Sequence, residues 1–254
     1  MLTFLGTGTS QGVPMIGCDC EVCHSSDPKD ERLRSSAYIQ TPECSFVVDT
    51  GTDFRMQALR QNVRTVDAVI FTHSHTDHIM GFDDLRPFAY QRGYMPVYAS
   101  ADTMQDLERV FEFAFKALNP FPGYLKPEPH VVNGPFTLGS TIITPLPVPH
   151  GNTTVNGYLF ERDRTKLIAY LSDCSGVPDD IAHTIRGVEV LIIDALRHKP
   201  HPTHLSVDQA IEVANRVQPG RTYFTHICHE LSQSAESELP PHTFLAYDGL
   251  RLEF

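Results

Sequence analysis

Short runs of apolar and β-branched residues recur along the chain, and turn-forming residues separate most of them. Runs of this kind are typical of buried β-strands. They predict strands over residues 2–5, 37–40, 45–49, 68–72, 96–99, 141–146, 155–161, 167–172, 188–194 and 222–225.

Three segments have the spacing of amphipathic helices, over residues 53–61, 101–118 and 207–217. The third has a clear start signal, because Ser206 is followed three residues later by Gln209, which is the pattern of a capping box. Residues 119–135 contain five prolines and predict a long loop, either functional or a plain connector. Because strands alternate with helices, we expect an α/β fold in one domain over residues 1–254.

Composition narrows the class of protein. The chain has 254 residues, 41% of them hydrophobic, and a net charge of −11. This charge argues against a nucleic-acid partner. No apolar run approaches the roughly 18 residues of a membrane span, and the N-terminus does not resemble a signal peptide. We therefore expect a cytoplasmic protein in which the six cysteines are reduced, so that clustered thiols indicate a metal site more than disulfides.

The segment HSHTDH follows the predicted strand 68–72 and carries His73, His75, Asp77 and His78 within six positions. Imidazole and carboxylate are good ligands for zinc, manganese or iron. Four such groups exceed what one catalytic metal needs when it keeps an open position. The segment therefore predicts a site for two metal ions.

Further candidate ligands each follow a later apolar run of the chain. They are His150, Asp173 and His226. Taken singly, each is more often a cap or turn residue, but the ordered set behind HSHTDH favours metal binding.

A second cluster predicts a structural zinc in an N-terminal loop over about residues 17–24. Cys18, Cys20 and Cys23 form a C-x-C-x2-C pattern, and a structural zinc needs a fourth ligand. His24 is adjacent to Cys23, where steric crowding disfavours binding of the same ion by both residues. His229 is therefore the better candidate for the fourth ligand. The other three cysteines have no partner spacing and are interpreted as small buried residues. They are Cys44, Cys174 and Cys228.

The HxHxDH pattern resembles the signature of the metallo-β-lactamase superfamily, which implies an αββα sandwich. By this resemblance His73, His75 and His150 hold one metal. Asp77, His78 and His226 hold the other, and Asp173 bridges the two. The sequence Asp-Thr-Gly at 49–51 follows a predicted strand and is similar to another hallmark of the superfamily. By this resemblance Asp49 orients a metal ligand; the alternative is a simple turn residue.

The whole set of motifs resembles the phosphoribosyl 1,2-cyclic phosphate phosphodiesterases of phosphonate degradation. The shared motifs are GTGTSQGVP, GCDCEVC, DTG, HSHTDH, LSD, HLS and THICH. The resemblance implies two divalent active-site metals, manganese or zinc, one structural zinc and a small phosphodiester substrate. It also makes a homodimer plausible.

The chemistry that this resemblance implies has two steps. A metal-bridging hydroxide attacks phosphorus. His204, which matches the HLS-type histidine of the family, protonates the leaving alkoxide. Asp77 and His204 are both expected to be catalytic residues, and Asp194 is expected to orient His204. His198 and His201 are either solvated loop residues or substrate contacts.

Other activities share part of this pattern. A tRNA 3′-processing endonuclease has the same histidine motif, but the acidic charge argues against it. A thioesterase of the glyoxalase II type shares the metal ligands but not the cysteine loop. A β-lactamase would be expected to carry an export signal, and a non-enzymatic zinc module does not need a two-metal ligand set.

Overall fold

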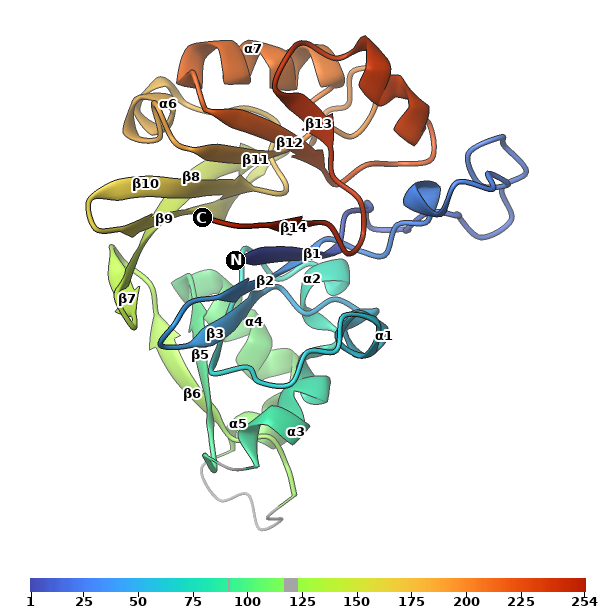
Figure 1. Ribbon diagram of the computed structural model, residues 1–254. Helices are drawn as coiled ribbons and strands as arrows, with labels where there is room; N and C mark the ends of the chain where they lie inside the picture. The colour runs from blue at the N-terminus through green and yellow to red at the C-terminus, as the bar shows by residue number, and fades with distance from the viewer. Residues whose placement is uncertain (91, 117–122) are drawn as a thin grey trace.

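Two mixed β-sheets pack face to face, and helices cover the outer face of each sheet (Figure 1). The computed structural model describes residues 1–90, 92–116 and 123–254. This arrangement is the predicted αββα sandwich. None of the described helices is long and apolar enough to cross a membrane.

The first sheet has the strand order β14-β1-β2-β3-β4-β5-β6. Its strands are β1 (Leu2–Gly6), β2 (Ser36–Gln40), β3 (Ser45–Val48), β4 (Ala68–Ile70), β5 (Met95–Ala99), β6 (Pro127–Val131) and β14 (Arg251–Leu252). From β3 to β6 neighbouring strands are parallel, whereas β14, β1, β2 and β3 pair antiparallel.

The second sheet has the order β13-β12-β11-β10-β9-β8-β7. Its strands are β7 (Phe136–Leu138), β8 (Thr141–His150), β9 (Thr153–Arg162), β10 (Thr165–Leu171), β11 (Val190–Asp194), β12 (Arg221–Thr225) and β13 (Thr243–Leu245). The strands from β10 to β13 are parallel, and those from β7 to β10 pair antiparallel. As a result β8, β10, β11 and β12 all end at the same edge.

The α-helices divide between the two outer faces. They are α1 (Phe54–Arg60), α2 (Thr76–Ile79), α3 (Arg86–Ala89), α4 (Ala101–Val110), α5 (Glu112–Phe115), α6 (Asp179–Thr184) and α7 (Val207–Val217). Three 3-10 turns lie at Pro28–Asp30, Phe82–Leu85 and Gln233–Glu238. The capping box of α7 forms as predicted, with Ser206 and Gln209 each accepting a hydrogen bond from the other's backbone N–H.

Three apolar layers hold the sandwich together. Between the sheets, Phe46 stacks on Phe160 with ring centroids 5.9 Å apart. A second layer joins the first sheet to α1–α5, and a third joins the second sheet to α6 and α7. Burial of these side chains is the main force favouring the fold.

Every predicted strand is present, with ends that differ by a few residues. The structure adds β6, β7, β13 and β14, so the prediction of a loop over 119–135 is wrong for residues 127–131. The sequence of β6, PEPHV, contains two prolines and stands at a sheet edge, where proline is tolerated. Residues 119–122 of that loop lie outside the described residues.

The predicted helix 101–118 is interrupted at Phe111, whose backbone leaves the helical conformation, and α5 follows as a separate turn. Residues 117 and 118 of that prediction lie outside the described part. Of the cysteines expected to be buried, Cys174 and Cys228 are, but Cys44 is only partly so.

The two ends of the chain are joined by the part-buried carboxylate of Asp248. Asp248 accepts hydrogen bonds from the Thr7 backbone (2.9 Å), the Thr7 hydroxyl (2.8 Å) and the Leu33 backbone (2.8 Å). The buried guanidinium of Arg32 also donates to the Thr7 hydroxyl (3.0 Å) and to Gln233 (2.7 Å). These bonds fix the N-terminal segment against the last strands of both sheets.

We therefore expect Asp248→Asn to lower the free energy of unfolding by ~1 kcal/mol, since the part-buried Leu33 N–H would face the new amide group instead of an acceptor. Burial raises the pKa of the Asp248 carboxyl to about 6, so urea denaturation should be measured at pH 8, where it is ionised. Glu253→Gln removes an exposed carboxylate near the same terminus and should change little. Equal stability of both variants would contradict this role.

Candidate metal centre and active site

Seven potential ligands gather where the strands of the two sheets end. The HSHTDH segment follows β4, His150 is the last residue of β8, Asp173 follows β10 and His226 follows β12. The ends of parallel strands meet at one edge of a sheet, which explains why residues so distant in sequence converge. The sequence-predicted ligands are thus brought together.

The first group consists of His73, His75 and His150, whose ligand atoms lie within 4.8 Å of one another. His73 Nε2 and His75 Nδ1 are 2.9 Å apart. His150 Nδ1 is 2.8 Å from the carbonyl oxygen of Thr203, so it is the donor there. This bond leaves Nε2 as the ring nitrogen of His150 that has a free lone pair.

The second group consists of Asp77, His78 and His226. Asp173 lies against it, with its two oxygens 3.3 Å from His78 Nε2 and 3.1 Å from His226 Nε2. The Asp173 carboxylate also groups with His73 and His78, and with His150 and His204. It is therefore in reach of both groups, as a bridging ligand must be.

Several buried atoms in this cluster have no hydrogen-bond partner. They include His78 Nε2, Asp173 Oδ1 and His226 Nε2. Leaving such atoms unsatisfied is costly, and both ring nitrogens lie within 3.3 Å of an Asp173 oxygen. Divalent cations would satisfy them, so the residues present fit two metal ions.

Charges within the cluster are strongly coupled: although burial opposes it, Asp173 raises the pKa values of His78 and His226 when no cation is present. Burial opposes ionisation of Asp173, but the neighbouring His226 and His78 outweigh it and hold its pKa well below its usual range. Burial, and then His78, lower the pKa of His73 well below its usual value. An ionised carboxylate and a neutral imidazole are the forms that bind metal.

One buried carboxylate orients a ligand of each group. Asp49 Oδ2 is 2.7 Å from His78 Nδ1 and also accepts from the Thr72 hydroxyl at 2.7 Å. The Thr72 backbone donates to Asp49 Oδ1 at 2.8 Å. Because the Thr72 hydroxyl gives its proton to Asp49, its oxygen accepts from His73 Nδ1, 2.9 Å away. Both histidines thereby turn Nε2 toward the centre.

The sequence predicted that Asp49 orients a ligand, but it did not single out Thr72. The only signal for Thr72 is a polar β-branched residue at a strand end, directly before the first histidine of the motif. Such a residue is more often an ordinary part of the strand, so periodicity alone does not mark it.

His204 lies at the border of the cluster. Its Nδ1 is 2.6 Å from Asp194 Oδ2, as the sequence predicted. Its ring centroid is 4.8 Å from that of His150 and 4.5 Å from that of His226. Burial and the neighbouring His226 lower the pKa of His204 to about 4. An anion bound beside Nε2 would raise that pKa and favour the protonated ring.

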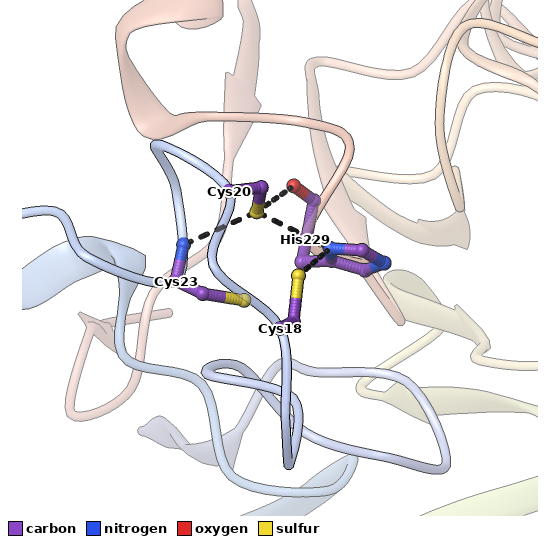
Figure 2. Close-up of side chains that lie close together, drawn as sticks. All are labelled: Cys18, Cys20, Cys23 and His229. Atoms are coloured by element: carbon purple, nitrogen blue, oxygen red, sulfur yellow. Dashed lines mark hydrogen bonds between the residues drawn. The ribbon is translucent and has the colours of Figure 1, made fainter.

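The three cysteines of the N-terminal loop meet His229, as Figure 2 shows. His229 Nδ1 is 3.2 Å from Cys18 Sγ and 3.3 Å from Cys20 Sγ, and the ligand atoms of all four residues lie within 4.8 Å. A hydrogen bond from the Cys23 backbone, and then His229, lower the pKa of Cys20 to about 6. Three sulfurs and one imidazole fit a tetrahedral zinc.

A short turn separates this cysteine site from the histidine cluster. His226 has a positive φ of 58°, and Ile227 then pairs with the N-terminal segment through Thr7 and Thr9. His226 therefore faces one cluster and His229 the other. His24 is instead beside Cys20 O and the exposed Asp19.

A cavity of about 240 Å³ lies between the two clusters. His204, Cys228 and His229 border it, together with Arg197 and His201. The sequence analysis left His201 undecided and did not name Arg197 as a site residue. His198, by contrast, is exposed.

The Thr72 hydroxyl should set the affinity of the histidine cluster for metal. Thr72→Val removes the acceptor for His73 Nδ1 and should weaken binding ~10–100-fold, whereas Thr72→Ser should stay close to wild type. Competition with a chromogenic chelator measures both. Wild-type affinity in Thr72→Val would show that the hydroxyl does not orient a ligand.

Cys20→Ser should remove zinc from the cysteine site and lower the melting temperature, because a structural zinc contributes directly to folding. Elemental analysis of protein purified without chelator measures the metal content. Cys44→Ser is the matched control, since Cys44 lies between β2 and β3, where its sulfur is 3.6 Å from the Thr41 hydroxyl. Full zinc content in Cys20→Ser would exclude the site.

Comparisons with known proteins agree with this geometry. A family model described as a β-lactamase superfamily domain matches residues 45–227. A solved structure described as a new diphosphatase from the PhnP family is 43% identical, with a TM-score of 0.91, over 100% of this chain and 96% of that one. The zinc-bound PqqB of Methylobacterium extorquens has a TM-score of 0.81 at 19% identity, over 100% and 99% of the two chains, which shows a shared fold.

Among curated proteins, an octanoyltransferase of Porphyromonas gingivalis is 34% identical over 252 residues. The match covers 97% of this chain but 50% of that protein, so the chain spans about half the length of this relative. The superfamily model and the full-length match to a PhnP-family structure decide the assignment. The chain belongs to the metallo-β-lactamase superfamily and, within it, to the PhnP family of metal-dependent hydrolases.

Proposed function

We propose that this chain hydrolyses a P–O bond in a small phosphodiester, with a cyclic ribose phosphate as the favoured substrate class. The observation that carries the proposal is the position of His204. It is paired with the buried Asp194 and stands directly beside the histidine-aspartate cluster. A proton donor next to a two-metal centre is what the cleavage of a phosphodiester with a poor leaving group requires.

The metal ions in this proposal are two divalent cations, manganese or zinc. Their ligands are His73, His75 and His150 for one, Asp77, His78 and His226 for the other, and Asp173 for both. When bound, such ions neutralise the phosphoryl oxygens and supply an activated water. A third ion, zinc, is held by Cys18, Cys20, Cys23 and His229.

His204 acts as the general acid. Asp194 accepts the hydrogen bond from Nδ1, so Nε2 is the atom that faces the substrate and delivers the proton. The anionic phosphate raises the pKa of the ring when it binds, so the substrate itself promotes the protonated form. Asp194 keeps the ring oriented while the proton leaves.

A phosphoric anhydride is the second candidate substrate, because the PhnP-family structure at 43% identity is described as a diphosphatase. The same metal ligands would serve both reactions. A phosphate is a better leaving group than a sugar alkoxide, so hydrolysis of a diphosphate would depend less on His204. Side-by-side assays of the two substrate classes separate these candidates.

Thioesters and RNA are less favoured substrates. A thioesterase of the glyoxalase II type would not use the cysteine site or the pairing of His204 with Asp194. The net charge of −11 is unfavourable for an RNA substrate. We therefore propose a small-molecule substrate. On the family resemblance alone, we also propose a homodimer as the assembly.

His204→Ala should slow hydrolysis of a ribose 1,2-cyclic phosphate by ~10²–10⁴-fold, which is the usual contribution of general acid catalysis. Hydrolysis of bis(nitrophenyl) phosphate should fall much less, because nitrophenolate leaves without a proton. Steady-state kinetics with both substrates measure the difference.

His198→Ala is the matched control, since it removes an exposed histidine from the same segment. It should leave both rates near wild type. Equal losses on the two substrates in His204→Ala would mean that His204 binds phosphate rather than donating a proton. No loss on either would remove His204 from the mechanism.

A further inference from the structure

The candidate metal ligands come from both sheets, so their geometry depends on how the two sheets are held together beside them. His73 and His75 follow β4 of the first sheet, whereas His150 ends β8 of the second. We propose that Tyr158 is a positioning residue of this centre, because its hydroxyl ties the backbone before His73 to the strands that carry His150. This inference rests on metal binding by the histidine-aspartate cluster, which is part of the proposed function, but not on the substrate.

The Tyr158 side chain reaches from the second sheet to the first. It stands on β9 and is fully buried in the apolar layer between the sheets. Its hydroxyl donates to the carbonyl oxygen of Phe71 at 2.8 Å. Phe71 directly follows β4 and comes shortly before His73. Burial raises the pKa of the Tyr158 hydroxyl above its usual value, so the group stays protonated and keeps this bond.

A backbone hydrogen bond from the same strand adds a second connection. The Asn156 backbone N–H donates to the carbonyl oxygen of Thr72 at 3.1 Å. Phe71 and Thr72 directly precede His73, so both of their carbonyl oxygens accept a bond from β9. Thr72 is also the residue whose hydroxyl accepts from His73 Nδ1. The bonds from β9 therefore set the position of the group that orients His73.

β9 also determines where the third ligand of this group lies. β8 and β9 pair antiparallel up to His150, which is opposite Thr153. Asn156 and Tyr158 follow Thr153 closely on the same strand. Both connections to the first sheet therefore start within a short stretch of His150. Because buried hydrogen bonds keep a narrow range of lengths, they fix the separation between His150 and the histidines that follow β4.

The residue between the two donors shows that β9 cannot easily move. A Cβ at Gly157 would lie 2.7 Å from the carbonyl oxygen of Tyr170 and 2.3 Å from Leu171 Cδ2. Both contacts belong to β10, the strand that leads to Asp173. Close packing on that side makes β9 a rigid support. The hydroxyl of Tyr158 therefore positions the segment before His73 against β9, rather than the reverse.

The test removes the hydroxyl and keeps the ring. Tyr158→Phe should weaken metal binding by the histidine-aspartate cluster ~10-fold, the lower end of the range for groups that orient metal ligands. Competition with a chromogenic chelator measures the affinity, and circular dichroism checks that the variant is folded. Zinc at the cysteine site is an internal reference. It should keep its wild-type affinity, because none of its candidate ligands lies on β8 or β9.

Tyr223→Phe is the matched control. Tyr223 stands on β12 in the same buried layer as Tyr158. Its ring faces β1 rather than β4, with its centroid 6.1 Å from that of Phe4. The variant therefore removes a core hydroxyl from the second sheet without touching the segment before His73. It should bind metal at both sites like wild type.

Wild-type affinity at the histidine-aspartate cluster in folded Tyr158→Phe would overturn the positioning role, and so would equal weakening at both metal sites. If wild type binds no metal at that cluster, the proposed function fails as well. A failure to hydrolyse any diester would count against the proposed substrate alone, because the affinities are measured without substrate.

If Tyr158→Phe does not fold, hydrogen exchange in the wild type decides. Coupling between two sites is reciprocal, so a β9 contact that strengthens metal binding must itself be strengthened by metal. Loading the histidine-aspartate cluster should slow exchange of the Asn156 amide more than that of the Phe160 amide, which lies further along β9. Equal slowing of the two amides would refute the inference.

Discussion

A single buried carboxylate, Asp49, holds together the part of the structure on which the chemistry depends. It accepts hydrogen bonds from His78 directly and, through Thr72, fixes His73. The two histidines belong to different ligand groups, so the orientation of both groups is set at one point. Asp49 itself has a positive φ of 61° and is fully buried, a conformation that only the surrounding packing maintains.

The glycines around Asp49 show how closely its turn packs against the ligands. A Cβ at Gly51 would lie 1.9 Å from the carbonyl oxygen of Asp77, and one at Gly81 would lie 2.2 Å from that of Gly51. The DTG turn and the short helix α2 therefore touch backbone to backbone. This contact explains why the motif requires glycine after Asp-Thr, and it links the end of β3 to the ligands that follow β4.

The second link is the turn from His226 to His229, which joins the histidine cluster to the cysteine site and forms part of the cavity between them.

Much of the fold and of the candidate metal sites could be predicted from the sequence, because the sequence patterns that indicate them are local. The HSHTDH segment, the cysteine pattern and the capping box at Ser206 all lie within a few residues, and the apolar runs of the central strands are unambiguous. The residues that were missed act through contacts between distant segments. Thr72 is important only because Asp49 lies on the neighbouring strand, and Tyr158 only because its hydroxyl reaches Phe71 in the other sheet. β6 was missed because its prolines are tolerated by its place at a sheet edge.

The central claim is that the histidine-aspartate cluster is organised around two metal ions. Anomalous X-ray diffraction from crystals of protein purified without chelator tests it most directly, with data collected on both sides of the zinc and manganese absorption edges. The account predicts one peak among His73, His75 and His150, a second among Asp77, His78 and His226, with Asp173 between them, and a third on the cysteine site. A single peak at the cysteines, with the histidine cluster empty after addition of divalent metal, would contradict it.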